Sequence, residues 1–344
     1  MLTVEYITER GHETVGHLHL ILPSVKFSEE MEQTCQLALD YVRESGICTP
    51  KDEIVLATLP KGVQSSFRSA KPEFLVLAIK MAAFQILLDN MIDQKSDNLQ
   101  ADKNAKNCIV QHFIDILRSK EVPAFQESCP AFPLFREFRN YLVMLVMTVR
   151  KTFDSPDIFF TSLEKNFQRY LTALEKTDEI TSDYYLAFKI YEIYIDVALS
   201  LSLLCHDIKK LSEYEPFQRF KEMHLTICCL ISDICSVEKD IRNQSLDDNY
   251  TLIIMNERKI SLQQSLQETV EYCNDTIIKS LLLKKRIIRG SKLLGVDQIS
   301  LIESMHVIEE MTQGVLDWAV HATNYHYKNM KVLFSESNSE LLVK

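Results

Sequence analysis

Residues 71–93 read KPEFLVLAIKMAAFQILLDNMID, a stretch that is apolar around most of a helical circumference before it ends in acids. A second stretch, EYEPFQRFKEMHLTICCLISDIC at 213–235, has the same character. A helix that is apolar on nearly every side must be surrounded by other elements. Both stretches therefore predict central helices of a bundle.

The rest of the chain supports this fold class. The 344 residues include only 7 Gly and 9 Pro, and no Pro follows Pro216. Sheets need Gly and Pro at their many turns, so an all-β fold is excluded, and no GxGxxG or GxxxxGK[ST] string indicates a nucleotide-binding βαβ fold. Helical periodicity predicts helices at 28–45, 71–93, 100–119, 133–153, 158–177, 181–209, 213–241, 260–288 and 297–328.

We therefore expect one all-α domain spanning residues 1–344. Its first part, 1–25, lacks a helical period and is expected to be an extended lead-in, and 329–344 is expected to be a disordered tail. No Ser/Gly linker, low-complexity tract or internal repeat divides the chain.

Charge and cysteine content narrow the function classes. The net charge is −10, which argues against nucleic-acid binding. The nine cysteines form no CxxC pair, so a zinc site is not indicated, and free thiols favour a reducing compartment. The N-terminus lacks the pattern of a signal peptide, and no apolar run is long enough to span a bilayer. We expect a cytoplasmic protein without a membrane span.

The first candidate site lies at the end of the 71–93 helix. Asp89 and Asp93 are four residues apart, so both lie on one helix face. Two adjacent carboxylates repel each other unless a cation lies between them, and Mg²⁺ prefers such oxygen ligands. The alternative is a helix end that emerges into water, where acids cost little.

The second candidate site is LISDICSVEKDIRN at 230–243. Ser232, Ser236 and Asp240 recur at i, i+4 and i+8 and span about 80° of one face, with Lys239 beside them. Hydroxyls and a carboxylate are suitable ligands for a Mg²⁺ ion that also binds a phosphate, and the lysine would face the phosphate oxygens. The alternative is the solvated polar face of an amphipathic helix.

Together the two motifs resemble those of the microbial class I terpene synthases. That family has DDxx(x)D on one helix and the triad (N/D)Dxx(S/T)xxxE about 140 residues later. Here the first motif reads DNMID at 89–93 and the second SDICSVEKD at 232–240. The family's Arg-Tyr pair, which follows a tryptophan, is matched by Asn324 and Tyr325 after Trp318. The resemblance covers about residues 23–327.

Several positions depart from the family pattern. The second acid of the first motif is Asn90, Ser232 replaces the usual Asn and Asp240 replaces Glu. Asn324 stands where an arginine would contact diphosphate. Lys189 is the nearest basic residue to the position of the family's diphosphate-sensing arginine, and lysine cannot bind phosphate bidentately.

The resemblance implies a helical bundle with a central active-site cavity and assigns a role to each motif residue. Three Mg²⁺ ions, which Mn²⁺ could replace, would be held by Asp89, Asp93, Ser232, Ser236 and Asp240. The catalytic residues would be Asp89, Lys189, Lys239 and Tyr325. The last three would also form the anion site, and Asn324 would contact substrate as well. The pocket would be lined by Phe84, Phe159, Phe160, Tyr185 and Trp318, although core packing remains the alternative for each ring. His321 and His326 are expected to be structural or surface residues.

The implied activity is that of a Mg²⁺-dependent terpene cyclase, a lyase of isoprenoid biosynthesis. It would ionise farnesyl or geranylgeranyl diphosphate to a carbocation that cyclises to a sesqui- or diterpene with release of diphosphate. One alternative is a prenyl-elongating synthase, which needs a second DDxxD where this chain has SDICSVEKD. Another is a non-catalytic scaffold that retains the fold, favoured by the missing arginines. A homodimer is left open.

Overall fold

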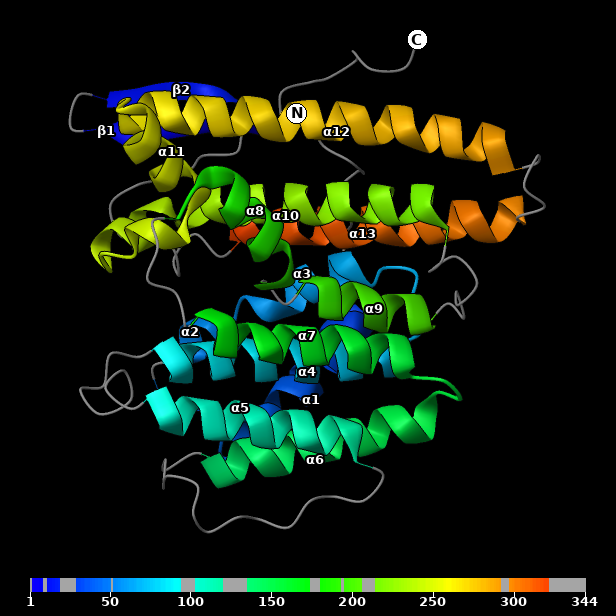
Figure 1. The fold of residues 1–344 in the computed structure, drawn as a ribbon. Helices are drawn as coiled ribbons and strands as arrows, with labels where there is room; N and C mark the ends of the chain where they lie inside the picture. Colours follow the sequence, from blue (N-terminus) through cyan, green and yellow to red (C-terminus); the bar gives the residue numbers. More distant parts are fainter. Residues whose placement is uncertain are drawn as a thin grey trace.

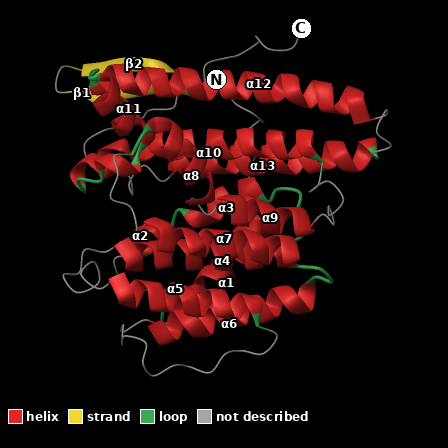
Figure 2. Cartoon of the chain, viewed as in Figure 1, coloured by secondary structure: helices red, strands yellow, loops and turns green. Residues whose placement is uncertain are grey.

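The computed structural model describes residues 2–8, 11–18, 29–50, 52–93, 103–119, 135–173, 180–192, 195–205, 214–291 and 297–321. Helices dominate these residues, as Figures 1 and 2 show. The predicted all-α bundle is thereby confirmed. The expected tail at 329–344 lies outside the described residues.

The long helices begin and end within three residues of the predicted boundaries where the structure describes them, and the predicted ends at 174–177 and 322–328 lie outside the described residues. These helices are α1 (Glu29–Glu44), α4 (Pro72–Asp93), α5 (Lys103–Arg118), α6 (Phe135–Thr152), α7 (Asp157–Ala173), α10 (Glu215–Arg242), α12 (Leu262–Ser291) and α13 (Gln298–His321). The stretch predicted as one helix over 181–209 contains two, α8 (Ser182–Glu192) and α9 (Ile195–Cys205). Short helices that periodicity did not predict are α2 (Glu53–Leu56), α3 (Leu59–Ser66), the 3₁₀ turn η1 (Leu246–Asp248) and α11 (Tyr250–Arg258).

The N-terminal segment differs from the expectation of a simple extended lead-in. Strands β1 (Leu2–Thr8) and β2 (Gly11–Leu18) pair antiparallel, with an irregularity between Val4 and Glu5. The hairpin packs against α12, and the side chains of Val4 and Leu18 are almost completely buried. Extended residues beside an apolar helix face satisfy their backbone groups by pairing with each other, which a test for helical periodicity does not detect.

Helix α4 occupies the centre of its half of the molecule, as predicted. It packs against α1, α3, α6 and α9, and its apolar side chains from Leu75 to Leu88 are largely buried. Figure 1 shows α5 and α6 on the side of α4 that faces away from α10. The acids at the end of α4 are therefore held on a helix that the core fixes in place.

Helix α10 packs against both α12 and α13. Figure 1 shows the order of layers from the hairpin through α12 to α10 with α13, and then to α3 and α9. Most of α10 is buried, including His224 and Asp233. The second stretch that the sequence predicted to be central is thus central in the fold.

Two further features concern membrane spans and disulfides. None of the described helices is long and apolar enough to cross a bilayer. The seven cysteines whose side chains the structure describes form no disulfide with one another.

Candidate functional site

The C-terminal half of α10 carries a polar face inside the protein. Because α10 is unbroken from Glu215 to Arg242, Ser232, Ser236 and Asp240 lie on one helix face. Ser236 and Asp240 are each only 8% exposed, and the Ser236 hydroxyl donates to Asp240 Oδ2 at 2.5 Å. Ser232 is half-buried one turn earlier. This face is therefore not the solvated face that the alternative interpretation required.

Asn249 connects this face to the next helix. Its amide nitrogen donates to the Asp233 carbonyl at 2.8 Å, to Asp240 Oδ2 at 2.9 Å and to Ser236 Oγ at 3.2 Å. Its amide oxygen accepts from the backbone N–H of Thr251 and so caps the N-terminus of α11. The Asn249 side chain is completely buried, so one residue fixes both motif oxygens and the start of α11.

Asp233 is a second buried acid on α10, next to the polar face. Its Oδ2 accepts hydrogen bonds from the Tyr185 hydroxyl and from the backbone N–H of Tyr250, both at 2.9 Å. Burial raises the pKa of Asp233 to about 7, while the positive charge of Lys189 acts in the opposite direction. Burial also raises the pKa of Tyr185, whose hydroxyl bonds the Asp248 carbonyl at 2.7 Å as well.

The two candidate anion-binding lysines flank this cluster. Lys189 on α8 donates to the Asp248 carbonyl at 3.3 Å, and its ammonium lies 5.4 Å from the centre of the Tyr185 ring. Lys239 is half-buried on α10, one residue before Asp240. Helix α8 thus places a cation beside the loop that leads from α10 to α11.

The first motif ends α4, whose last residue is Asp93. The backbone of Asp89 and Asp93 is helical, and their side chains lie outside what the structure describes. Between them, Asn90 donates to Asp52 Oδ1 at 3.3 Å and so connects the end of α4 to the turn before α2. Asn90 therefore has a structural contact where the family has a second acid.

Figure 1 shows the C-terminal ends of α4 and α10 directed toward the same end of the molecule, where α8 and α11 also lie. The two motifs, at 89–93 and 232–240, are far apart in the sequence but lie at the same end of the bundle. Asn324, Tyr325 and His326, which the sequence analysis singled out, lie outside the described residues, as does the side chain of His321.

The five candidate aromatic residues occupy different environments. Phe84 is fully buried and stacks with Tyr141 at a ring-centre separation of 5.9 Å, amid further rings from α5, α6 and α7. Phe159 and Phe160 pack against each other, and Phe160 also lies 5.3 Å from the guanidinium of Arg150. These contacts are those of core packing. A place in the substrate pocket stays a prediction for each.

Trp318 and Tyr185 differ from the phenylalanines because each makes a polar contact. The Trp318 indole N–H donates to the Thr58 hydroxyl at 2.9 Å, which joins α13 to the start of α3. Tyr185 bonds Asp233, as described above. Tyr185 is therefore the candidate ring in direct contact with the polar cluster of α10.

The donor set on α10 is compatible with a hard divalent cation. It offers hydroxyl and carboxylate oxygens, the ligands that Mg²⁺ prefers, at a partly desolvated position. Among the described residues, no three His, Cys, Asp or Glu side chains form a metal cluster by themselves. A metal site here would combine the oxygens of α10 with the acids that end α4.

Sequence reasoning missed Asp233 and Asn249. Asp233 stands inside the motif directly after Ser232, but the i, i+4, i+8 pattern assigned it to another face. Asn249 precedes a helix, and Asn at such a position is a common N-cap. That signal predicts the cap but not the hydrogen bonds to Ser236 and Asp240, which depend on how α11 folds back on α10.

Comparisons with known proteins identify the family of this chain. The family model for terpene synthase family 2, C-terminal metal binding, matches residues 80–279, more than half of the chain and a region that includes both motifs. The chain therefore belongs to this terpene synthase family, whose model describes a metal-binding region. No curated protein matches the sequence.

Solved structures show the same fold at low sequence identity. A T181N cucumene synthase superposes with a TM-score of 0.74 at 14% identity, covering 89% of this chain and 99% of that one. Linalool/nerolidol synthase from Streptomyces clavuligerus gives 0.72 at 13%, covering 88% and 99%. Germacradien-4-ol synthase from Streptomyces citricolor gives 0.71 at 10%, with the same coverage. The class I terpenoid synthase fold is thus established for this chain.

Proposed function

We propose that this protein is a Mg²⁺-dependent terpene cyclase that acts on farnesyl or geranylgeranyl diphosphate and releases diphosphate and a sesqui- or diterpene. The observation that carries the proposal is the buried Ser236–Asp240 pair on α10, within the metal-binding region of a terpene synthase. The similar solved structures bear names of cucumene, linalool/nerolidol and germacradien-4-ol synthases, which supports a terpenoid product. We further propose a cytoplasmic location.

The metal ligands in this proposal are Asp89 and Asp93 on α4 and Ser232, Ser236 and Asp240 on α10. The chemistry that divalent ions supply is neutralisation of the diphosphate oxygens, which makes cleavage of the substrate C–O bond easier. Asn249 holds Ser236 and Asp240 in place. A ligand set that is already fixed loses less conformational freedom on binding than a mobile one.

The remaining proposed residues act on the substrate. Lys189 and Lys239 place positive charge beside the leaving diphosphate, with Asn324 and Tyr325 as further contacts. The pocket must then exclude water, because water would quench the allylic carbocation. Aromatic rings stabilise positive charge without reacting with it, and the proposed rings are Phe84, Phe159, Phe160, Tyr185 and Trp318.

A second candidate function, a non-catalytic scaffold, is favoured by one specific observation. Asn249 already satisfies Ser236 and Asp240, so the polar face of α10 is internally hydrogen-bonded without any ligand. Lys189 in place of an arginine agrees with this alternative. A prenyl-elongating synthase gains no comparable support.

The test is incubation of the purified protein with geranyl, farnesyl and geranylgeranyl diphosphates, with and without Mg²⁺, followed by gas chromatography and mass spectrometry. A terpene that forms only with metal supports the proposal, and Asp89→Ala should abolish its formation. Asp154→Ala, an exposed acid in the turn after α6, is the matched control and should retain activity. Longer prenyl diphosphates would identify an elongating synthase. No product from a folded sample would favour the scaffold.

A further inference from the structure

The outer face of the C-terminal half of α12 exposes large aliphatic side chains. Ile278, Leu281 and Leu282 are 45%, 40% and 50% exposed. Lys285 and Arg289 follow at helical spacing on the same face and are also exposed. We call these five residues the outer stripe. Large apolar residues are exposed on other helices too, among them Leu37, Met147 and Ile299, but here three lie together on one face beside cations.

The same part of α12 concentrates positive charge. Residues 276–292 read TIIKSLLLKKRIIRGSK and contain no acid, although the whole chain has a net charge of −10. Within the part of the chain that the structure describes, Lys285, Arg286 and Arg289 form no ion pair. The aliphatic residues are therefore flanked by cations that have no acidic partner on their own helix.

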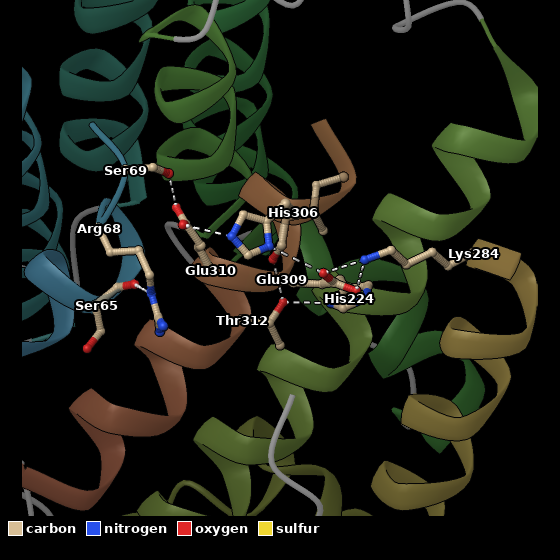
Figure 3. Close-up of polar contacts among 10 residues, drawn as sticks. Ser65, Arg68, Ser69, His224, Lys284, His306, Glu309, Glu310 and Thr312 are labelled. Carbon is tan, nitrogen blue, oxygen red and sulfur yellow. Dashed lines mark hydrogen bonds and ion pairs between the residues drawn. The ribbon is translucent and has the colours of Figure 1, made fainter. Parts of the chain in front are cut away.

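One lysine of this segment faces the other way and fixes the orientation of the helix. Lys284 donates to both carboxylate oxygens of Glu309 on α13 at 2.7 Å, and Glu309 is only 4% exposed. Figure 3 shows Lys284 reaching inward from α12 to Glu309, beside His224 and Thr312. This buried ion pair ties the inner face of α12 to the core, so Lys285 and Arg289 are held on the outside.

The hairpin covers only the first half of α12. Asn274 donates to the backbone carbonyl of His17, and Gly16 lies against the side chain of Val270. Figure 1 shows β1 and β2 over the N-terminal part of α12, and the five residues of the outer stripe, farther along the helix, are exposed. The outer face of α12 is therefore exposed along its length, acidic at Glu271 and Asp275 and then aliphatic and basic at the outer stripe.

We propose that the outer stripe, together with Arg286, docks the protein on an anionic lipid surface. The cations would contact headgroup phosphates, and Ile278, Leu281 and Leu282 would enter the region between headgroups and acyl chains. Exposed basic and aliphatic residues on one helix face are the pattern that binds such an interface. The proposal uses only the outer face of α12 and is independent of the proposed activity.

Charge favours a lipid surface over a second copy of the chain. A symmetric dimer centred on Lys285, Arg286 and Arg289 would bring the cations of two copies together, because the acids of this face, Glu271 and Asp275, lie at the other end of the outer stripe. Like charges placed together at an interface disfavour association. An anionic bilayer instead supplies the opposite charge along the whole stripe.

The test is flotation of the full chain with vesicles of phosphatidylcholine alone or with about a third phosphatidylserine. Binding is expected with the anionic vesicles, weaker at high salt. Lys285→Glu/Arg286→Glu/Arg289→Glu should weaken it by at least about tenfold, since each cation near an anionic surface contributes several-fold to binding. Leu281→Ser/Leu282→Ser should also weaken binding without a change in charge.

The matched control is Lys61→Glu/Lys71→Glu/Lys151→Glu, which changes the net charge equally at exposed lysines on other elements. It should bind nearly as well as the unmodified chain. Circular dichroism and melting temperature establish that each variant is folded. Equal binding to both vesicle types, or equal loss in the control, would overturn the proposal. So would a concentration-dependent dimer in sedimentation velocity that the Lys285/Arg286/Arg289 variant abolishes.

Discussion

At the scale of single residues, Asn249 joins the candidate metal face to the helix that follows it. Its amide N–H groups serve three acceptors on α10, and its oxygen caps α11. A buried acceptor left without its donor costs about 1–3 kcal/mol, and loss of an N-cap costs about 0.5–2 kcal/mol. The contribution of this residue to stability is therefore larger than that of a surface asparagine.

Asn249→Ala is expected to lower the free energy of unfolding by about 2–4 kcal/mol because it removes both the cap and the donors. Urea unfolding followed by circular dichroism measures this. Asn249→Asp is the informative companion: it keeps a capping oxygen but replaces the donor with a second carboxylate beside Asp240. If Asn249→Asp were as stable as the unmodified chain at neutral pH, the amide donors would not hold the site together.

His224 leads to a prediction about pH. It is completely buried on α10, its Nδ1 lies 2.8 Å from the Thr312 hydroxyl, and its Nε2 has no hydrogen-bond partner among the described residues. Figure 3 shows this pair beside Lys284 and Glu309. Burial, together with the nearby charge of Lys284, lowers the pKa of His224 to about 3. The native protein therefore keeps this imidazole neutral.

The sign of the effect follows from proton binding. As pH falls below about 6.5, His224 takes up a proton in the unfolded chain but not in the native one, so stability is full above that pH and declines below it. Between pH 6.5 and 5 the loss from this one group is about 2 kcal/mol. His224→Phe should give a flatter dependence of the unfolding free energy on pH. Parallel curves for the two proteins would show that another group carries the effect.

At the scale of elements, two glycines allow α3 and α13 to lie close together. A Cβ added at Gly314 would come within 2.5 Å of the Ser66 backbone nitrogen, and one added at Gly62 would lie 2.5 Å from the Trp318 Cβ. Neither contact is possible without movement of a helix. The position of α13, which carries Trp318 and Glu309, thus depends on residues without side chains.

Gly314→Ala is expected to destabilise the protein by about 1–3 kcal/mol, the usual cost of forcing extra volume into a packed interior. Gly290→Ala on α12 is the matched control, since nothing lies within 4 Å of a Cβ placed there. That substitution should stabilise the helix by up to about 1 kcal/mol. Calorimetric melting of both variants measures the difference. A neutral Gly314→Ala would mean that α3 and α13 can separate at little cost.

At the scale of the whole molecule, the two motifs at one end of the bundle lead to a prediction about ligands. A ligand that binds only the native state raises its melting temperature. Mg²⁺ and inorganic diphosphate together should raise it by several degrees, and each alone should raise it less, because the proposed site binds them jointly. Differential scanning fluorimetry measures this without any turnover.

Asp89→Ala and Asp240→Ala should each remove the joint shift, since one acid comes from α4 and the other from α10. Asp154→Ala serves again as the exposed control and should keep it. If the unmodified protein showed no shift with both ligands, the scaffold interpretation would gain support. A shift that survived in Asp240→Ala would mean that α10 contributes no metal ligand.

How far the sequence predicts this protein differs from element to element. The helices at 71–93 and 213–241 were predicted within two residues of their observed bounds, because a helix surrounded by others must be apolar on nearly every side. The hairpin and α3 were not predicted. They are short, and their pairing depends on partners far away in the chain, α12 for the hairpin and α13 for α3.

The sequence alone determined the all-α class, the order of the long helices and the spacing that places Ser232, Ser236 and Asp240 on one face, because these depend on periodicity within one helix. Only the tertiary structure decided that Ser236 and Asp240 are buried, that Asn249 and Asp233 join their cluster, and that Lys284 faces inward while Lys285 faces outward. Those properties depend on which elements pack against α10 and α12, and such contacts join residues far apart in the chain.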